Sequence, residues 1–524
     1  MVGVFVLAAV VAGGVVTDRG LVTNVEERTV GNATAFRYVV PVGAMVLSEA
    51  TEWTFPVDCD VWYQESANGY EKPYVGGKVG DIPVGTRIGL PLTLRRPDGK
   101  YEFVSEANLV DWTDLAVEYR GGGRFVALYH AQKESFTPQG TVSPWRVSIV
   151  ADDLQGLATS TAIRDLCPEP PAERARKAKD FAIPGRCTWQ WLASGDPVYA
   201  EQRSWYDRTR ELGWEYYLID DGWKTWRDGA DDQWACLRKA IDYGKSIGVK
   251  TAIWVDSKEM PDRASRLRYL TKVRDAGAVG IKIDFMPPCD FKTCRWYEET
   301  LEDTFELGLF VDFHGAVKPT GREKTWPHEL AREAIRGHEW HVTRYRRIQD
   351  FAHDTILPFH RLVQGHADYT PVVLEPMQLM RFTLAHELAQ GVVFSCPFLC
   401  FGDRPENYLK SPAAWLLKEM PATYDEVRVF SCSEIGEVAA VAKRKGEVWY
   451  VGVLNGARRR TVTLDFSFLT EGSRFAFEGF GDAPKYWSEL TDLQAKEFEV
   501  RREDKVEIVL SQGGGFVGRL RKVR

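Results

Sequence analysis

One repeat in the middle of the chain limits its possible folds more than any other feature. Short apolar runs begin near Cys187, Trp214, Lys250, Gly280 and Leu309, so consecutive runs start 27 to 36 residues apart. Four amphipathic segments lie between these runs, each followed by a glycine of the kind that ends a helix: 199–212, 233–247, 264–276 and 295–307. Strands that alternate with helices predict a parallel sheet, and the number and length of the units predict a (β/α)8 barrel.

Sequence with β texture flanks this repeat on both sides. Before it, alternating apolar and polar residues are broken by turn signals such as Pro97-Asp98-Gly99, and after it similar segments follow, such as Val448–Val453. A segment rich in Pro and charge at 168–179 is typical of a linker. We therefore expect three domains: an N-terminal β-sandwich at 1–166, a catalytic (β/α)8 barrel at 167–425 and a small C-terminal β-sandwich at 426–524.

Composition excludes several functional classes. The 67 Lys and Arg against 74 Asp and Glu give a net charge of −7, which argues against nucleic acid as a partner. The apolar run Val4–Val16 is shorter than the ~20 residues of a membrane span, so we expect a buried strand there and no transmembrane segment. His338-Glu-Trp-His341 is one residue short of the zinc protease spacing. The cellular compartment and the oligomeric state stay open.

Acidic side chains recur where the predicted strands end. In a barrel of this type catalytic groups lie at the carboxyl ends of the strands. The polar residues at these ends are Asp220 and Asp221, Asp256, Asp284, His314 and, in a sixth segment at 332–339, Glu333 and Glu339. A single acid at a strand end is more often a helix N-cap, but four or more at one edge indicate a carboxylate-lined cleft. Such a cleft suits glycoside hydrolysis, which needs two carboxylates.

Several sequence blocks resemble glycoside hydrolase family 97. The longest are GIKIDFM at 280–286, VDFHGAVKPTG at 311–321 and REAIRGHE at 332–339. Shorter blocks are LIDDGW at 218–223, SPWR at 143–146 and ADYTP at 367–371. The blocks occur in the family's order. The resemblance as a whole extends from about residue 30 to the C-terminus. The resemblance implies the three-part architecture predicted above, activity on α-glucosides or α-galactosides, and a calcium ion (Ca²⁺) near the catalytic acid.

The residue after His314 separates the two branches of the family. The inverting α-glucosidases have a Glu there as the base, whereas this chain has Gly315. The resemblance therefore implies a retaining, exo-acting α-galactosidase, with Asp284 as nucleophile and Glu339 as general acid/base. In retaining enzymes the two carboxyl groups lie about 5–5.5 Å apart, against about 6.5–9.5 Å in inverting ones.

The resemblance also suggests the metal and substrate contacts. Glu106, Glu333 and Glu339 resemble calcium ligands of the family, and Glu106 would come from the N-terminal sandwich. The residues expected to contact an oligosaccharide or α-glycoside substrate are Lys282, His314, Asp221 and Trp254. An ion pair with an acid is an equally good interpretation of Lys282. Asp221 is one carbon shorter than the family's usual Glu, which puts its sugar contact in doubt.

Two alternatives stay open at this point. The first is an α-glucosidase, or another α-glycosidase, on the same scaffold. The second is a non-catalytic carbohydrate-binding protein, against which Asp284 and Glu339 argue because both are retained. Residues 1–29, which precede the start of the resemblance, are too few for the rest of the family's N-terminal sandwich, so we expect a truncated domain. The linkage and chain length of the substrate are not encoded in any motif.

Overall fold

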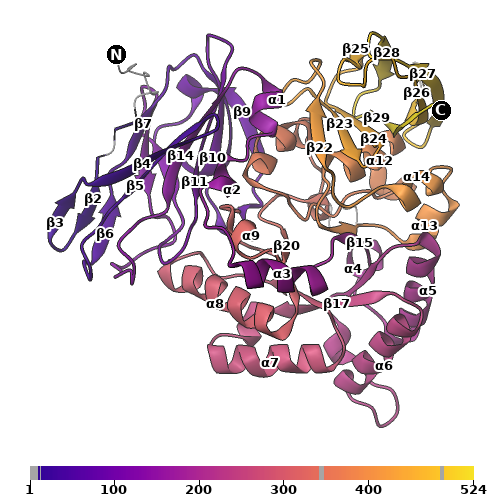
Figure 1. Cartoon of the computed structure of the whole chain (residues 1–524), viewed down its shortest axis with the longest axis horizontal. Coiled ribbons are helices and arrows are strands. Elements are labelled where there is room, and N and C mark those ends of the chain that lie inside the picture. The colour runs from indigo at the N-terminus through magenta and orange to yellow at the C-terminus, as the bar shows by residue number, and fades with distance from the viewer. Residues whose placement is uncertain (1–9, 12, 342–346, 484–488, 524) are drawn as a thin grey trace.

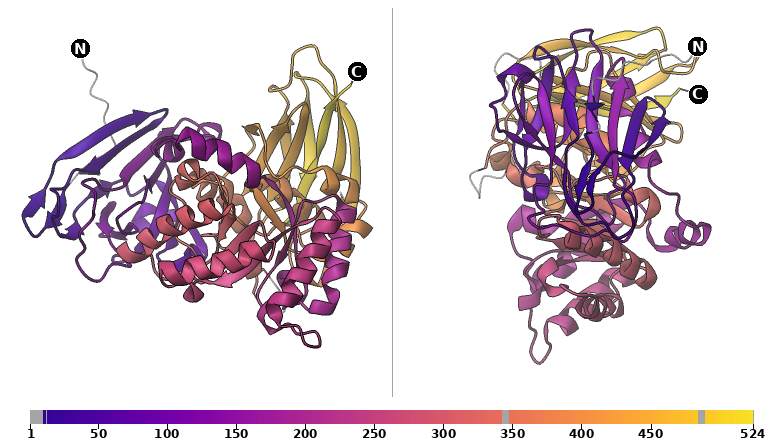
Figure 2. Two further views of the ribbon diagram at one scale, coloured as in Figure 1. Left: turned by 60° about the horizontal axis from the view of Figure 1, so that its bottom comes forward. Right: turned by 90° about the vertical axis from the view of Figure 1, so that its left-hand side faces the viewer.

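The computed structural model describes residues 10–11, 13–341, 347–483 and 489–523. It has the three expected parts: two β-rich domains, one at each end of the chain, and a helix-wrapped barrel between them (Figure 1). Both β-rich domains lie against the barrel, as the left-hand view of Figure 2 also shows. Among the described residues, none of the helices has both the length and the apolar character needed to cross a membrane.

The N-terminal domain is built on one large antiparallel sheet and one small sheet. The large sheet contains, in spatial order, β1 (Val10–Val11), β7 (Glu52–Thr54), β13 (Arg124–Leu128), β12 (Ala116–Tyr119), β10 (Arg87–Arg95), β11 (Tyr101–Ala107), β14 (Trp145–Ala151), β5 (Ala33–Tyr38) and β4 (Val25–Val30), with β8 (Asp60–Glu65) on β10 and β9 (Tyr74–Lys78) on β8. The small sheet contains β3 (Gly20–Val22), β2 (Val15–Thr17) and β6 (Val46–Glu49). Most of the apolar run Val4–Val16 lies outside the described residues.

The barrel sheet has seven parallel strands among the described residues and is nearly closed. In spatial order these are β20 (Glu329–Arg332), β19 (Phe310–Phe313), β18 (Gly280–Asp284), β17 (Lys250–Asp256), β16 (Tyr216–Ile219), β15 (Gly185–Trp189) and β21 (Phe398–Phe401). Among the described residues, the two outer strands, β20 and β21, do not pair with each other. The sixth strand ends at Arg332, so the predicted segment 332–339 is the loop that follows it.

The helices of the barrel begin and end close to the predicted residues. The four expected helices are α5 (Gln202–Leu212), α6 (Gln233–Ser246), α7 (Arg263–Asp275) and α8 (Phe291–Leu307). Gly213 and Gly308 end two of them in the left-handed conformation, with φ of 72° and 70°, which costs glycine little. The predicted linker is partly helical, as α3 (Ala172–Phe181). The other helices used below are α4 (Gln190–Ser194), η6 (His338–Trp340), α11 (Pro376–Leu379), α12 (Leu384–Val393) and α13 (Pro405–Lys410).

The C-terminal domain is a second β layer that packs on α12. Its main sheet is β22 (Glu426–Val429), β23 (Val438–Lys445), β24 (Val448–Asn455), β29 (Gly515–Lys522), β26 (Phe475–Asp482) and β27 (Leu493–Val500), with β25 (Arg460–Asp465) and β28 (Lys505–Leu510) as a separate pair. His386 of α12 lies 3.0 Å from the carbonyl oxygen of Gly514, and Thr383 donates to Asp482 at 2.7 Å. These bonds join the C-terminal domain to α12 of the barrel.

Candidate active site

The end of β18 holds Asp284 by both carboxylate oxygens. Trp254, on the neighbouring strand β17, donates from Nε1 to Oδ2 of Asp284 at 2.9 Å. The backbone N–H of Phe285 donates to Oδ1 at 2.6 Å. Phe285 has a left-handed φ of 55° and a side chain that is 57% exposed, a strained arrangement of the kind found at functional sites. Asp284 is therefore a fixed carboxylate at the open end of the barrel, and Trp254 contacts it through a hydrogen bond.

Lys282 is buried one side-chain position below Asp284 and pairs with Asp220. Its Nζ lies 3.0 Å from Oδ2 of Asp220, which also accepts from Trp189 Nε1 at 2.8 Å. Burial alone would lower the pKa of Lys282, but the carboxylates of Asp220, Glu339 and Asp284 raise it well above its usual value. The ion pair, one of the two interpretations of Lys282, is thus present.

Asp220, and not Asp221, is the acid of this pair in the cluster. Asp221 is exposed, and its carboxylate accepts from the backbone N–H of Gly222 at 2.9 Å. Asp221 is therefore not part of the buried pair, and its predicted substrate contact stays a prediction. Asp220 was visible in sequence as a strand-end acid without an assigned role.

Glu339 lies on η6 with only 19% of its side chain exposed. Burial raises the pKa of this carboxyl to about 7, against the opposing effect of Lys282 and His314, while the charge of Asp284 adds to the increase. A carboxyl group with a pKa near neutrality can both donate and accept a proton, which is what a general acid/base needs. Asp284 and Glu339 are thus electrostatically coupled, as two carboxylates that share one cleft must be.

His314 links three acids at the end of β19. Its Nε2 lies 2.8 Å from Oδ2 of Asp368, and its Nδ1 lies 3.4 Å from Glu333 and 4.0 Å from Glu339. Burial would lower the pKa of His314, but Glu333 and the other acids around it raise the value well above normal. The side chain is therefore held by Asp368 and faces the acids of the cleft.

A cluster of acids beside His314 could hold a cation. The ligand atoms of His314, Glu333 and Glu339 all lie within 4.8 Å of one another. Glu71, from the loop after η1 (Asn68–Tyr70) of the N-terminal domain, accepts from Trp340 Nε1 at 2.9 Å. Burial raises the pKa of Glu333 well above normal, and the nearby charges of Glu71 and Glu339 contribute. Crowded oxygen ligands with raised pKa values suit a hard divalent cation such as calcium.

Glu106 does not belong to this cluster. One of its carboxylate oxygens lies 3.0 Å from Nη1 of Arg146 and the other 2.7 Å from Nζ of Lys318, and its side chain is fully buried. Both oxygens therefore already face cations, one from each domain, which leaves neither oxygen free for the metal-ligand role predicted for Glu106. Because Lys318 follows β19, Glu106 does join the sandwich to the barrel, through an ion pair. The acid that the N-terminal domain brings to the site is Glu71, and no sequence signal marks it.

Gly315 borders Asp284 and has a backbone conformation that other residues rarely adopt. Its φ is 54°, and a Cβ built on it would lie 3.5 Å from Oδ1 of Asp284 and 3.4 Å from the backbone nitrogen of Phe285. The backbone N–H of Gly315 donates to Glu333 at 2.7 Å. The left-handed conformation therefore favours glycine at this position beside the carboxylate.

A parallel barrel with two half-buried carboxylates, one at the end of β18 and one in the loop after β20, has the arrangement that glycoside hydrolysis needs. Comparison with family models agrees. Three models match in order: glycosyl-hydrolase 97 N-terminal at residues 15–169, glycoside hydrolase 97 at 187–335, and glycosyl-hydrolase 97 C-terminal, oligomerisation, at 423–521. The chain belongs to glycoside hydrolase family 97.

Two relatives with curated names are described as retaining alpha-galactosidases, one of them as probable. The chain is 29% identical over 449 residues to a probable retaining alpha-galactosidase of Streptomyces bingchenggensis, which covers 83% of this chain and 68% of the relative. It is 26% identical to the retaining alpha-galactosidase of Bacteroides thetaiotaomicron, over 94% of this chain and 82% of the relative.

Solved structures show the same fold. A family 97 enzyme of Pseudoalteromonas sp. strain K8 in complex with acarbose has a TM-score of 0.85 at 19% identity, covering 95% of this chain and 85% of that one. A beta-arabinopyranosidase has a TM-score of 0.82 at 23% identity, covering 98% and 90%. At these identities the likeness establishes the arrangement of the domains.

Proposed function

We propose that the protein is a retaining, exo-acting α-galactosidase that removes terminal α-galactosyl residues from oligosaccharides or other α-glycosides. The observation that carries this proposal is the fixed carboxylate of Asp284 at the end of β18, with Gly315 beside it. In the family's inverting branch a Glu occupies the position of Gly315 and acts as the base. Gly315 has no carboxylate, so we assign to Asp284 the role of the nucleophile that forms the covalent intermediate. The names of the two curated relatives support the same branch.

The residues of the cleft divide the reaction between them. Glu339, whose pKa is raised to about 7, donates a proton to the glycosidic oxygen while Asp284 attacks the anomeric carbon. A galactosyl ester of Asp284 forms and the leaving group departs with the proton. The Glu339 carboxylate then takes a proton from water, and the resulting nucleophile releases galactose with its α configuration. Lys282 and His314 are positioned by Asp220 and Asp368, and we propose that they contact sugar hydroxyls.

We also propose a calcium ion at the acid cluster. Glu71, Glu333 and Glu339 would supply its carboxylate ligands, and Glu71 replaces Glu106 in this set. When bound, calcium supplies positive charge that offsets the repulsion between these acids and favours the ionised form of Glu339. Since Glu71 comes from the N-terminal domain, that domain would complete the site.

The experiment that tests this function follows the anomer released from an aryl α-galactoside by NMR, with the matching α-glucoside and β-arabinopyranoside as comparison substrates. Galactoside cleavage that releases the α-anomer first, and that Asp284→Ala abolishes, supports the proposal. Glucoside cleavage with inversion would instead support the α-glucosidase alternative, with another carboxylate as base. Binding of galactosides without cleavage of any substrate would support the carbohydrate-binding alternative.

A further inference from the structure

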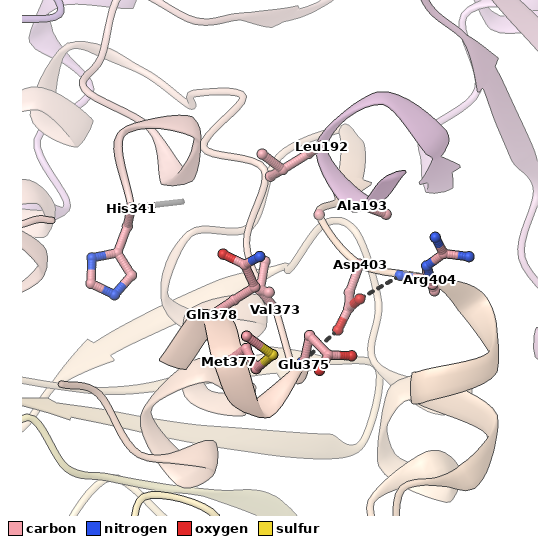
Figure 3. Close-up of a pocket in the computed structure, with 10 residues that line it drawn as sticks. Leu192, Ala193, His341, Val373, Glu375, Met377, Gln378, Asp403 and Arg404 are labelled. Atoms are coloured by element: carbon pink, nitrogen blue, oxygen red, sulfur yellow. Dashed lines mark hydrogen bonds between the residues drawn. The ribbon is translucent and has the colours of Figure 1, made fainter. Parts of the chain in front are cut away.

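A cavity lies at the carboxyl ends of β15 and β21, and Figure 3 shows the residues that line it. Its volume is about 410 Å³, within the ~300–1,000 Å³ range of small-molecule sites. The residues that matter for its chemistry are Leu192 and Ala193 of α4, Val373, Glu375 and Met377 of the loop before and within α11, and Arg404 after β21. The residues that hold the proposed nucleophile do not line this cavity.

The cavity lies on the side of the barrel from which a leaving group must depart. β21 is four positions from β18 around the sheet, which is half a turn of an eight-stranded barrel, so the cavity lies opposite Asp284. Displacement by Asp284 expels the leaving group on the far side of the anomeric carbon, where the general acid protonates it. His341, two residues after Glu339, lines the cavity. The segment that carries Glu339 therefore reaches the wall of the cavity.

The loop that forms one wall of the cavity is strained and firmly held. Thr370 and Val372 have left-handed φ values of 56° and 69°, which are uncommon for β-branched residues, and both precede Val373–Glu375 of the wall. Asp403 fixes the same loop, because its Oδ2 accepts from the backbone N–H groups of Leu374 at 2.7 Å and Glu375 at 2.9 Å. Strain that the surrounding structure maintains in this way is concentrated at ligand sites.

The wall presents polar groups that are open for a ligand. Within the part of the chain that the structure describes, the guanidinium of Arg404 has no hydrogen bond or ion pair. The carboxylate of Glu375 receives one long contact, 3.4 Å from Nδ2 of Asn407. Beside them lie the apolar side chains of Leu192 and Val373, which are 4% and 5% exposed. An apolar surface bordered by a carboxylate and a guanidinium matches a sugar ring, which has a C–H face and hydroxyl groups that donate and accept.

We propose that this cavity is the leaving-group subsite and that it binds a sugar residue, with Arg404 and Glu375 as its specificity-determining residues. The inference rests on the proposed glycosidase function and adds to it the substrate class: a glycoside whose leaving group is itself a saccharide. A simple alkyl or aryl leaving group could not hydrogen-bond to Arg404 and Glu375. A site with such polar groups discriminates against substrates that leave them unpaired.

The test compares two substrates that share the transferred sugar, an α-galactosyl disaccharide and α-galactosyl fluoride. Fluoride has no atoms to reach the cavity. For Arg404→Ala and Glu375→Gln we expect the ratio of kcat/KM for the disaccharide to that for the fluoride to fall at least tenfold, mainly through KM of the disaccharide. Lys410→Ala is the matched control, since Lys410 is an exposed cation on α13 that does not line the cavity. An unchanged ratio in both variants overturns the proposal.

A binding measurement separates this inference from the proposed function. Calorimetric titration of the Asp284→Asn protein with the disaccharide needs no turnover. We expect at least tenfold weaker binding when Arg404→Ala is added, and no change when Lys410→Ala is added. If the wild-type protein hydrolyses neither substrate, the proposed function fails, and the titration still decides the subsite. Equal affinity with and without Arg404, or no binding of the disaccharide, overturns it.

Discussion

Two clusters of acids in this protein differ in how their charge is balanced. In the N-terminal cluster, Glu106 contacts Arg146 and Lys318, and Glu49 accepts two hydrogen bonds from Arg146, at 2.8 and 2.6 Å. In the barrel cluster, Asp284, Glu333 and Glu339 have no salt bridge with lysine or arginine among the described residues. The first arrangement stabilises a domain, and the second leaves its acids available for chemistry.

The pKa shifts express the same difference. Burial raises the pKa of Glu49, but Arg146 outweighs it, so the value is lowered. Burial raises the pKa of Glu339 to about 7, and nearby acids add to the effect. Tyr70 and Glu71 connect the two clusters: Tyr70 donates to Asp114 at 2.6 Å in the N-terminal cluster, and Glu71 faces the barrel cluster. A buried acid is therefore a functional candidate when its neighbours leave its charge uncompensated.

The largest effect should follow removal of Asp284. Asp284→Ala deletes the carboxylate that forms the covalent bond, and we expect kcat/KM for an aryl α-galactoside to fall by about 10⁴-fold or more. Circular dichroism and thermal unfolding should stay those of the wild type. Asp221→Ala, which removes the exposed neighbouring strand-end acid, should cost less than about tenfold. Equal losses in the two variants would contradict the distinction between the buried cluster and its exposed neighbour.

Glu339 should control the pH dependence. The acid form must donate a proton, so kcat/KM should decrease as the pH rises through the pKa of Glu339, which burial raises to about 7 without calcium and which bound calcium would lower. Glu339→Gln should remove this alkaline decrease and lower kcat/KM for disaccharides by about 10²- to 10⁴-fold. An aryl substrate with a good leaving group should lose much less in its first step. A pH profile that is unchanged in Glu339→Gln would assign the acid to another residue.

Glu106 should matter for stability. Glu106→Ala leaves Arg146 and Lys318 buried without this carboxylate, and breaking a buried ion pair costs about 3–5 kcal/mol. We expect that decrease in the free energy of unfolding, measured by denaturation in urea. Arg37→Ala is the control, since it breaks an ion pair with Glu26 that is partly exposed and should cost less than about 1 kcal/mol. Equal effects would show that burial does not distinguish the pairs.

We expect the smallest effect on calcium affinity, which should decrease on substitution of Glu71 but not of Glu106. Loss of one carboxylate ligand should weaken calcium binding by about 10- to 100-fold, so we expect Glu71→Gln to do so in a calorimetric titration. Glu106→Gln should leave the calcium affinity of the folded protein unchanged. A chelator should reduce activity of the wild type, and added calcium should restore it. The reverse result for the two glutamates would return Glu106 to the ligand set.

The sequence predicted the barrel segment well because its signals are local. Apolar strands, amphipathic helices and the glycines that end them, such as Gly213 and Gly308, are all encoded within some thirty residues. Strand-end acids are visible by the same rule, which is how Asp284 was found. The pairing of Asp220, and not Asp221, with Lys282 could not be read from sequence, because the direction of a side chain beyond a strand end depends on the packing around it.

The sequence by itself determined the order of the three domains, the family and the carboxylates at the ends of the barrel strands, because periodicity and contiguous blocks carry this information along the chain. Only the tertiary structure decided which acids share a site. Glu71 and Glu106 lie in the same domain, and each looks like an ordinary acid in sequence. Packing pairs Glu106 with two cations and brings Glu71 beside Glu333, more than 250 residues away in the chain. Charge compensation depends on neighbours in space, and folding alone chooses them.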